Sequence, residues 1–248
     1  MKTLFISDLH LNPERPDIQA CFEQFIKSCL SSKLNNINAI NSLYILGDLF
    51  EFWIGDDASI PFYEHSISQL KQLSDSGISI FVMHGNRDFL MGADFEQASG
   101  CTLIPDLFHL KISSDIESPT ILLSHGDIFC SDDKEYMKFR QMVRDPHWQA
   151  EFLAKTIDER FSIARAMREQ SKQRGQQLYS QETAAEITDV NQKTVEQIMS
   201  AHNVNTLIHG HTHRPASHEF QLNRQLAKRI VLPDWTPDAT VFEINQSA

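Results

Sequence analysis

The sequence lacks the features that mark membrane-spanning, secreted and nucleic-acid-binding proteins. No apolar run approaches the roughly 18 residues of a membrane span, and Asp8 and His10 interrupt the apolar start MKTLFISDLHL before a signal-peptide core could form. The four cysteines are widely spaced and include no Cys-x-x-Cys pair, which argues against a disulfide framework or a thiolate zinc site. Basic residues are scarce as well: 22 Lys and Arg against 33 Asp and Glu give a net charge of −11, which argues against general affinity for nucleic acid. We therefore expect a cytosolic protein with reduced thiols, whose contact with a membrane is at most peripheral.

Strand and helix patterns alternate along the first third of the chain, as in a layered α/β fold. Apolar residues between Ile18 and Leu30 recur at the three- and four-residue spacing of an amphipathic helix, and residues 61–75 predict another helix. Two runs near the C-terminus, RIVLP (229–233) and TVFEI (240–244), predict late strands. Five apolar runs that each end in polar residues predict buried strands: TLFIS (3–7), LYILG (43–47), ISIFVM (78–83), PTILLSH (119–125) and NTLIH (205–209). Ligands gather at the carboxyl ends of strands in α/β sheets, so the pattern predicts one composite site in a single domain spanning 1–248.

A long insertion separates two of these strand ends. Between His125 and His211 lie 85 residues, whereas a strand-helix-strand connection needs only about 30. The surplus is rich in Phe, Met and Trp at helical spacing, and we expect a helical cap over approximately 131–200. Within it, the polar run SKQRGQQLYSQET (171–183), with one glycine, predicts a hinge or a flexible loop.

Five short polar motifs follow the predicted strands: DLH, GDLFE, GNRD, SHGD and GHTH. Each is weak alone, because Asp-x-His and Gly-Asn are commonly turns or caps. Together they supply carboxylate, imidazole and amide oxygens, the ligands of divalent transition ions such as Mn, Fe or Zn. Two ions about 3.5–4 Å apart need a bridging group, for which Asp48 is the candidate.

The five motifs, in this order, resemble the calcineurin-type metallophosphoesterase superfamily. The resemblance implies an α/β fold, a four-layer αββα sandwich, with a helical insertion as its lid. It also implies that a first metal would take Asp8, His10, Asp48 and His213, and that a second would take Asp48, Asn86, His125 and His211.

Other acidic and histidine residues beside the motifs have less specific interpretations. We expect His84 and His209 to pack or bond locally. The carboxylates Asp56, Asp57 and Asp127 either orient a histidine or simply belong to turns.

Arg87 stands after Gly-Asn, where many phosphoesterases of the superfamily carry a histidine. An arginine cannot donate a proton near neutral pH, but its fixed fork can clamp phosphate oxygens and offset charge that develops in the transition state. The residue therefore favours a substrate whose leaving group is already good, such as a pyrophosphate.

Longer stretches narrow the resemblance to one family of enzymes. FISDLHL, LYILGDLFEFWIGDD, HGNRDFL, CSDD, DVNQ and IHGHTHRP closely resemble the UDP-2,3-diacylglucosamine diphosphatases of bacterial lipid A synthesis. The resemblance implies that water activated by two Mn²⁺ ions attacks the α-phosphorus, giving UMP and 2,3-diacylglucosamine 1-phosphate, with Arg87 and Asp48 as catalytic residues. It implies a monomer at the cytoplasmic side of the bacterial inner membrane, bound peripherally. The substrate-binding positions that it implies are Asn86, Arg87, Asp133, Ser171 and His211.

Three alternatives stay open at this point. The apolar cap residues either shelter acyl chains or form only an ordinary helical core. Arg160, Arg165, Arg168 and Lys172 either make a solvated face or attract anionic lipid headgroups or the substrate diphosphate. The chain itself could be a broader phosphodiesterase or nucleotide pyrophosphatase, or a phosphoesterase fold kept as a non-catalytic scaffold.

Beyond Ser171 the run KQRGQQLYSQETAAEIT departs from the family pattern, so no substrate contact is assigned to 172–188.

Overall fold

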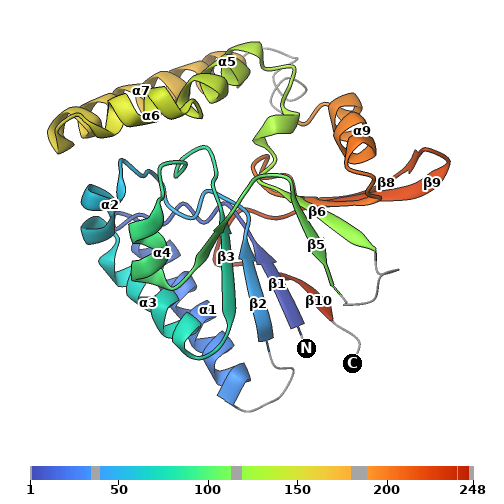
Figure 1. Ribbon diagram of the computed structural model, residues 1–248, viewed down its shortest axis with the longest axis horizontal. Helices are drawn as coiled ribbons and strands as arrows, with labels where there is room; N and C mark the ends of the chain where they lie inside the picture. Colours follow the sequence, from blue (N-terminus) through green and yellow to red (C-terminus); the bar gives the residue numbers. More distant parts are fainter. Residues whose placement is uncertain (1, 35–39, 113–118, 180–188, 239, 246–248) are drawn as a thin grey trace.

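Two five-stranded sheets form the centre of the protein. The computed structural model describes residues 2–34, 40–112, 119–179, 189–238 and 240–245. The first sheet has the strand order β10-β1-β2-β3-β4 (Figure 1). Its parallel strands are β1 (Lys2–Ile6), β2 (Ile40–Ile45), β3 (Ser79–Met83) and β4 (Thr102–Ile104), with β10 (Phe242–Asn245) antiparallel at the edge.

The second sheet has the order β5-β6-β7-β9-β8. Its centre is parallel: β6 (Thr120–Ser124), β7 (Thr206–His209) and β9 (Gln225–Val231). Its edges, β5 (Phe108–Lys111) and β8 (Ala216–Leu222), run antiparallel to their neighbours.

Side-chain alternation along the strands builds four layers. In β1, Leu4 and Ile6 join the core under the helices of the first sheet, whereas Phe5 points into the core between the sheets. In β7, Ile208 joins that same central core, and Leu207 packs on the opposite side. The outer helices are α1 (Pro16–Leu34), α2 (Asp56–Phe62), α3 (Glu64–Asp75) and α4 (Ala93–Ser99) on the first sheet, and α9 (Gln192–Ala201) on the second (Figure 1). The predicted αββα sandwich is confirmed.

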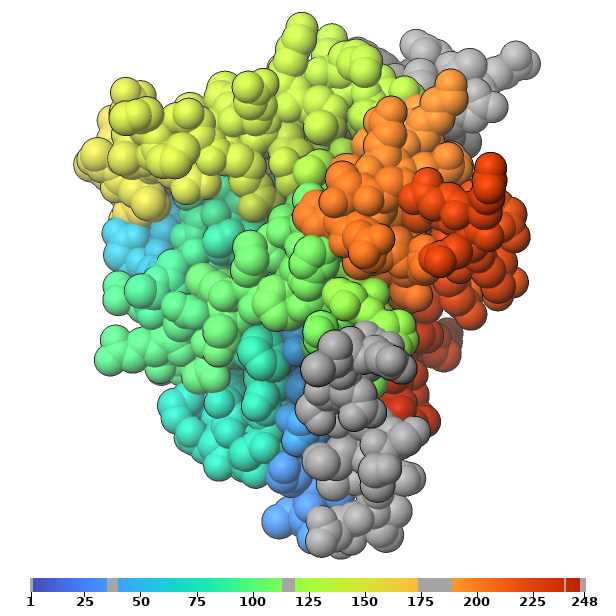
Figure 2. Space-filling model, turned by 45° about the vertical axis from the view of Figure 1, so that its right-hand side comes forward, coloured from blue at the N-terminus to red at the C-terminus, as the bar shows by residue number. Residues whose placement is uncertain are grey.

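Three cap helices lie at the end of the molecule where the parallel strands finish: α5 (Lys134–Val143), α6 (Pro146–Leu153) and α7 (Ile157–Tyr179) (Figures 1 and 2). A short 3₁₀ turn, η1 (Asp127–Phe129), leads from β6 toward α5. Phe152 is buried in the core of the first sheet, and Trp148 and Ile163 pack against that core. Since α9 belongs to an outer layer, with Val195 and Met199 buried on the second sheet, we place the cap within 134–179 of the described residues.

The prediction of a hinge over 171–183 is wrong for its first nine residues. Helix α7 continues to Tyr179, while 180–183 lie outside the described residues. A single helical glycine costs only about 1 kcal/mol relative to alanine, and the surrounding Lys, Arg and Gln are good helix formers. The polarity of residues 171–173 matches their exposed positions on this helix.

The helix predicted over 61–75 is two helices. The chain breaks between α2 and α3 at Tyr63, which caps both and has only 2 % of its surface exposed. Pro61 lies within the short α2 and lacks the N–H that a longer helix would use.

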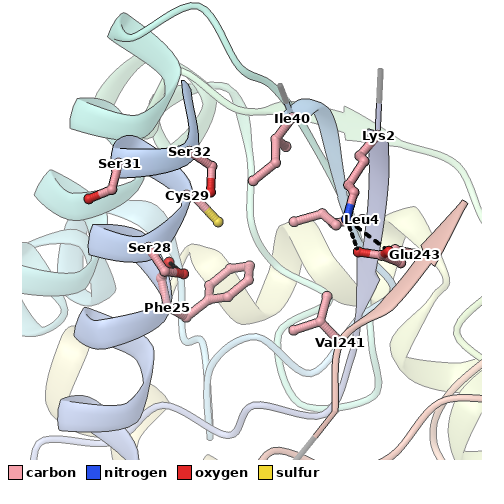
Figure 3. Close-up of a pocket in the computed structure, with 10 residues that line it drawn as sticks. All are labelled: Lys2, Leu4, Phe25, Ser28, Cys29, Ser31, Ser32, Ile40, Val241 and Glu243. Carbon is pink, nitrogen blue, oxygen red and sulfur yellow. Dashed lines mark hydrogen bonds and ion pairs between the residues drawn. The ribbon is translucent and has the colours of Figure 1, made fainter. Parts of the chain in front are cut away.

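A cavity of about 450 Å³ lies at the opposite end of the first sheet from the cap (Figure 3). Its lining includes Leu4 and Ile40 near the amino ends of β1 and β2, Phe25 of α1, and the ion-paired Lys2 and Glu243. None of the predicted site residues line this cavity, so the candidate site lies elsewhere in the molecule.

Among the described residues, none of the helices combines the length and the apolar composition needed to cross a membrane.

Candidate metal centre

The carboxyl ends of five parallel strands bring the predicted ligands to one place. Asp8 and His10 follow β1, Asp48 follows β2, Asn86 follows β3, and His125 follows β6. His211 and His213 follow β7 in the same way. Hydrogen bonds join the two sheets at these ends: the His211 N–H donates to Asp8 Oδ2 at 2.8 Å, and the His125 Nδ1–H donates to the Leu46 carbonyl at 2.9 Å. The two sheets therefore share one site.

The backbone at this site adopts an unusual conformation. Five predicted ligands have φ in the left-handed region, and they make up five of the nine such non-glycine residues in the described part of the chain. Asp and His tolerate this region better than most residues, but each such residue still costs of order 1–3 kcal/mol and persists only where the surroundings hold it. The five are Asp8 (55°), His10 (48°), Asp48 (51°), His211 (70°) and His213 (53°).

One half of the site joins Asp8, His10, Asp48 and His213. His10 Nε2 lies 3.5 Å from His213 Nε2 and 3.7 Å from Asp48 Oδ2. His213 Nε2 lies 3.3 Å from Asp8 Oδ1. Ligands that each sit about 2.0–2.2 Å from one ion are roughly 3–3.5 Å apart, so this spacing fits a single cation with little movement.

The other half joins Asn86, His125 and His211 with the second oxygen of Asp48. Asn86 Oδ1 lies 3.0 Å from His125 Nε2 and 2.9 Å from His211 Nδ1, and His125 Nε2 lies 3.8 Å from Asp48 Oδ1. The His125 Nδ1–H donates to the Leu46 carbonyl at 2.9 Å, which leaves Nε2 free to accept a cation.

Asp48 lies between the two halves, with one oxygen directed to each. Only 2 % of its surface is exposed, and its Oδ1 accepts a hydrogen bond from the Arg87 N–H at 2.8 Å. A Cβ at Gly85 would collide with this carboxylate, so the absence of a side chain there lets the Asn86 loop approach Asp48.

A polar atom without a partner supports a cation at this site. Asp8 is 1 % exposed, and its Oδ1 accepts no hydrogen bond. A buried carboxylate oxygen is costly unless a charge or a donor meets it. Oxygen and nitrogen donors of this kind fit divalent transition ions, and the residues present therefore fit divalent metal ions.

The electrostatics also favour positive charge. Burial alone lowers the pKa of His125, but Asp48, Asp127 and Asp8 outweigh it and raise the pKa to about 9. Burial and the neighbouring Asp48 raise the pKa of Asp88 to about 6. Burial raises the pKa of Asp8, yet the His213 ring, whose Nε2 lies 3.3 Å from Oδ1, and the charge of His125 hold it below its usual range. Without a cation the cluster retains a proton at neutral pH, and a metal ion can replace that proton.

The remaining predicted site residues lie at the edge of this cluster and on the cap. The Nε of Arg87 is buried and makes no hydrogen bond, while the Arg87 carbonyl accepts from the Trp53 N–H at 3.1 Å. Asp133 is 8 % exposed and caps α5 by accepting from the Tyr136 N–H at 2.8 Å. Ser171 is exposed on α7.

The two histidines outside the predicted ligand set, His84 and His209, hydrogen-bond to nearby backbone carbonyls. The His84 Nε2–H donates to the Met91 carbonyl at 2.9 Å, and His209 Nδ1–H donates to the Gly210 carbonyl at 2.9 Å. Both histidines bond locally, as predicted.

The three carboxylates for which the sequence allowed two interpretations, Asp56, Asp57 and Asp127, make different contacts. Asp56 is the first residue of α2 and accepts from the Gly92 N–H at 3.0 Å, and Asp57 pairs with Arg160 at 2.5 Å. Asp127 is fully buried and accepts from the Tyr136 hydroxyl at 2.7 Å and from Arg140 Nε at 2.8 Å. These contacts do not orient a histidine directly.

Two carboxylates near the histidines were missed from the sequence. Glu51 Oε2 lies 3.4 Å from His10 Nδ1, and Asp234 Oδ2 lies 3.7 Å from His213 Nδ1. A carboxylate at the far nitrogen of a ligating histidine fixes the ring and raises its basicity. The only sequence signal was the place of Glu51 in GDLFE and of Asp234 in LPDW.

Two basic residues of α7 turn out to contact the body of the protein. Arg168 forms an ion pair with Glu51, and the Arg160 side chain is only 3 % exposed in its pair with Asp57. A fully solvated basic face is therefore wrong for these two positions, because Arg168 attaches the cap to the loop after β2 and Arg160 attaches it to α2.

The fold and the polar strand ends define a metal-dependent phosphoesterase. The calcineurin-like phosphoesterase family matches residues 1–215, and the chain belongs to this family. Its curated relatives include proteins named UDP-2,3-diacylglucosamine hydrolase. That of Chromohalobacter salexigens is 47% identical over 237 residues, covering 96% of this chain and 90% of the relative. Those of Stenotrophomonas maltophilia and Azotobacter vinelandii are 40% and 42% identical, covering 99% and 100% of this chain and 95% and 96% of the relatives. The resemblance predicted from the motifs is confirmed, and the protein is a metal-dependent hydrolase.

Proposed function

We propose that the protein hydrolyses the pyrophosphate bond of UDP-2,3-diacylglucosamine to UMP and 2,3-diacylglucosamine 1-phosphate, a step of lipid A synthesis. The observation that carries the proposal is the convergence of six ligand side chains around Asp48 in a chain that is similar over almost its whole length to hydrolases of that name. A scaffold without catalysis has no chemical need for every one of these ligands.

Two divalent ions, Mn²⁺ by the family resemblance, fit the two halves of the site. Asp8, His10 and His213 would hold one ion, and Asn86, His125 and His211 the other, with Asp48 between them. When bound, such a pair supplies Lewis acidity and a nucleophile at neutral pH. The chain's own contribution is to fix the ligand positions before the substrate arrives, since strained backbone and buried hydrogen bonds already hold them.

Arg87 binds the phosphate in this account. Its backbone is fixed at Asp48, and its buried Nε lacks a partner in the protein. A guanidinium beside the cluster offsets charge on the phosphate oxygens as the bond breaks, and it does not transfer a proton. The leaving phosphate monoester needs no general acid, which fits a pyrophosphate and not an alkyl phosphodiester.

The cap is the proposed binding site for the acyl chains. Large apolar side chains stay partly exposed on α6, α7 and the adjoining α2: Leu153 (41%), Ile157 (49%), Phe161 (48%) and Phe62 (45%). An ordinary helical core would cover such residues, whereas a lipid substrate gives them a function. Asp133 and Ser171 of the cap, with Asn86 and His211 of the metal site, complete the proposed substrate contacts. We propose a monomer bound peripherally to the cytoplasmic face of the inner membrane, where such a substrate resides.

Comparison of acylated and unacylated substrates tests the proposal. Purified protein with Mn²⁺ should release UMP from UDP-2,3-diacylglucosamine, and EDTA should abolish the release. UDP-glucosamine, which lacks the acyl chains, should be cleaved with a kcat/KM at least about 10²-fold lower, because remote binding energy is lost with the chains. Equal rates on the two substrates would favour the alternative of a broad nucleotide pyrophosphatase.

A further inference from the structure

Two arginines of the first cap helix contact the two loops that carry Asn86 and His125. Arg140 lies in the last turn of α5, and Arg144 is the C-cap of that helix, so the four-residue spacing places them on the same face. Both side chains are half-buried, and each one donates hydrogen bonds to the loops beneath the cap. The family motifs do not include either residue.

Arg144 contacts the Asn86 loop from the outside. Its Nη2 donates to the Gly85 carbonyl at 2.8 Å and to the His84 carbonyl at 3.3 Å, and its guanidinium carbon lies 5.8 Å from the centre of the Phe89 ring. The inner side of the same loop faces Asp48, since the Arg87 N–H donates to Asp48 Oδ1. The loop is therefore held between the metal site and the cap.

Arg140 contacts the His125 loop through two carboxylates. Its Nε donates to Asp127 Oδ2 at 2.8 Å, and its Nη2 donates to Asp106 Oδ2 at 2.9 Å. The other oxygen of Asp106 accepts from the Ser124 hydroxyl at 2.7 Å and from the His125 N–H at 3.3 Å. The arginine thus holds the residues on both sides of His125 in place.

The other half of the site is held without either arginine. The Asp8 N–H donates to the Gly47 carbonyl at 3.1 Å, and the His10 N–H donates to the Asp48 carbonyl at 2.9 Å. These bonds join the loops after β1 and β2 directly. A loss of Arg140 or Arg144 leaves them intact.

We propose that α5 is a strut and that Arg140 and Arg144 are positioning residues for the metal position formed by Asn86 and His125. The two guanidinium groups set the separation of the two loops. The position of α5 on the body of the protein is therefore coupled to metal binding at Asn86 and His125. The inference rests on the proposed two-metal function, and it predicts that changes in the cap act on one of the two ions selectively.

Metal titration of full-length variants tests the strut. Arg144→Met and Arg140→Lys are compared with the wild type and with Lys138→Met, which removes an exposed charge from the same helix. Arg140→Lys keeps a charge for the buried Asp127 but cannot span both carboxylates, so it tests the role without leaving that group unpaired. Isothermal titration with Mn²⁺ should show two ions bound to the wild type and to Lys138→Met.

The two arginine variants should lose affinity for one ion by about 10–100-fold, the range typical of groups that orient metal ligands, and keep the other within about twofold. Their kcat should fall with KM little changed, and Arg144→Lys, which can still donate to a carbonyl, should recover part of the lost affinity. Wild-type affinity for both ions in Arg144→Met and Arg140→Lys would overturn the proposal. So would an equal loss of both ions together with a lowered Tm, since that is the result of a merely structural role. Failure of the wild type to bind two ions or to release UMP would instead refute the proposed function.

Discussion

At the scale of single residues, the site depends on side chains that the backbone presents in a left-handed conformation. Asp8, Asp48 and His211 reach the cluster because their loops turn sharply at the strand ends. A sequence can indicate such positions, since Asp and His after buried strands are visible in it. It cannot show that Glu51 and Asp234 lie beside His10 and His213, because those contacts join segments far apart in the chain or depend on how a loop turns back.

Arg87 provides the first residue-scale prediction. Arg87→Ala should keep its full Mn²⁺ content, because only the backbone of Arg87 contacts Asp48, while kcat on the diphosphate substrate should fall by about 10²–10³-fold, as for other groups that stabilise transition-state charge. Metal analysis and steady-state kinetics measure the two quantities. Arg87→Lys, which keeps a charge without the fork, should fall between the two. Loss of metal from Arg87→Ala would mean that the side chain has a structural role.

His125 provides a prediction on pH. In the metal-free protein its pKa is raised from 6.5 to about 9, so the stability that its protonated form contributes is present below pH 6.5 and is lost as the pH rises through 9. Metal binding needs the neutral ring and releases the proton. The affinity for Mn²⁺ should therefore increase between pH 6.5 and 9, and the increase in Tm on adding Mn²⁺ should grow over the same range. A pH-independent affinity, with no proton release in buffers of different ionisation enthalpy, would contradict this assignment.

At the scale of secondary-structure elements, burial decides what the sequence reveals. Strands β1, β2, β3, β6 and β7 are buried and were predicted from their apolar runs. Strand β8 was missed because its residues ASHEFQL are almost all exposed and form no continuous apolar run. The pairing of β8 with the neighbouring β9 stabilises it, and such pairing is not encoded in the local sequence.

The attachment of α7 provides a prediction at this scale. Arg160 donates to the Ile54 carbonyl at 2.7 Å and pairs with Asp57. Since Asp57 is 61% exposed, removing the pair should cost only about 1–2 kcal/mol. Arg160→Met should thus lower Tm by about 3–6 °C, increase hydrogen exchange in α7 and raise KM for the lipid substrate.

Arg165→Met is the matched control, because Arg165 lies exposed on the same helix. It should leave Tm, exchange and KM near their wild-type values. If Arg160→Met also behaves like the wild type, the pair with Asp57 does not hold the cap, and the attachment must come from apolar packing at Phe152 and Trp148.

At the scale of the whole molecule, two sheets and a cap meet at a single edge. The loops after the strands of the two sheets supply all seven proposed metal ligands, and the cap covers the carboxyl ends of these strands (Figures 1 and 2). The protein has a net charge of −11. Four of its acidic side chains are buried at this edge: Asp8, Asp48, Asp88 and Asp127. The protein as a whole therefore favours cations at this edge, and we expect metal ions and Arg87 to offset the charge of the proposed diphosphate substrate.

Hydrolysis in ¹⁸O-labelled water tests the central claim most directly. The Mn²⁺-loaded protein, given UDP-2,3-diacylglucosamine, should release UMP that carries one labelled oxygen, because water attacks the α-phosphorus, and the 2,3-diacylglucosamine 1-phosphate should be unlabelled. Mass spectrometry of both products gives the answer. Label in the lipid phosphate, or no UMP from folded and metal-loaded protein, would contradict the account.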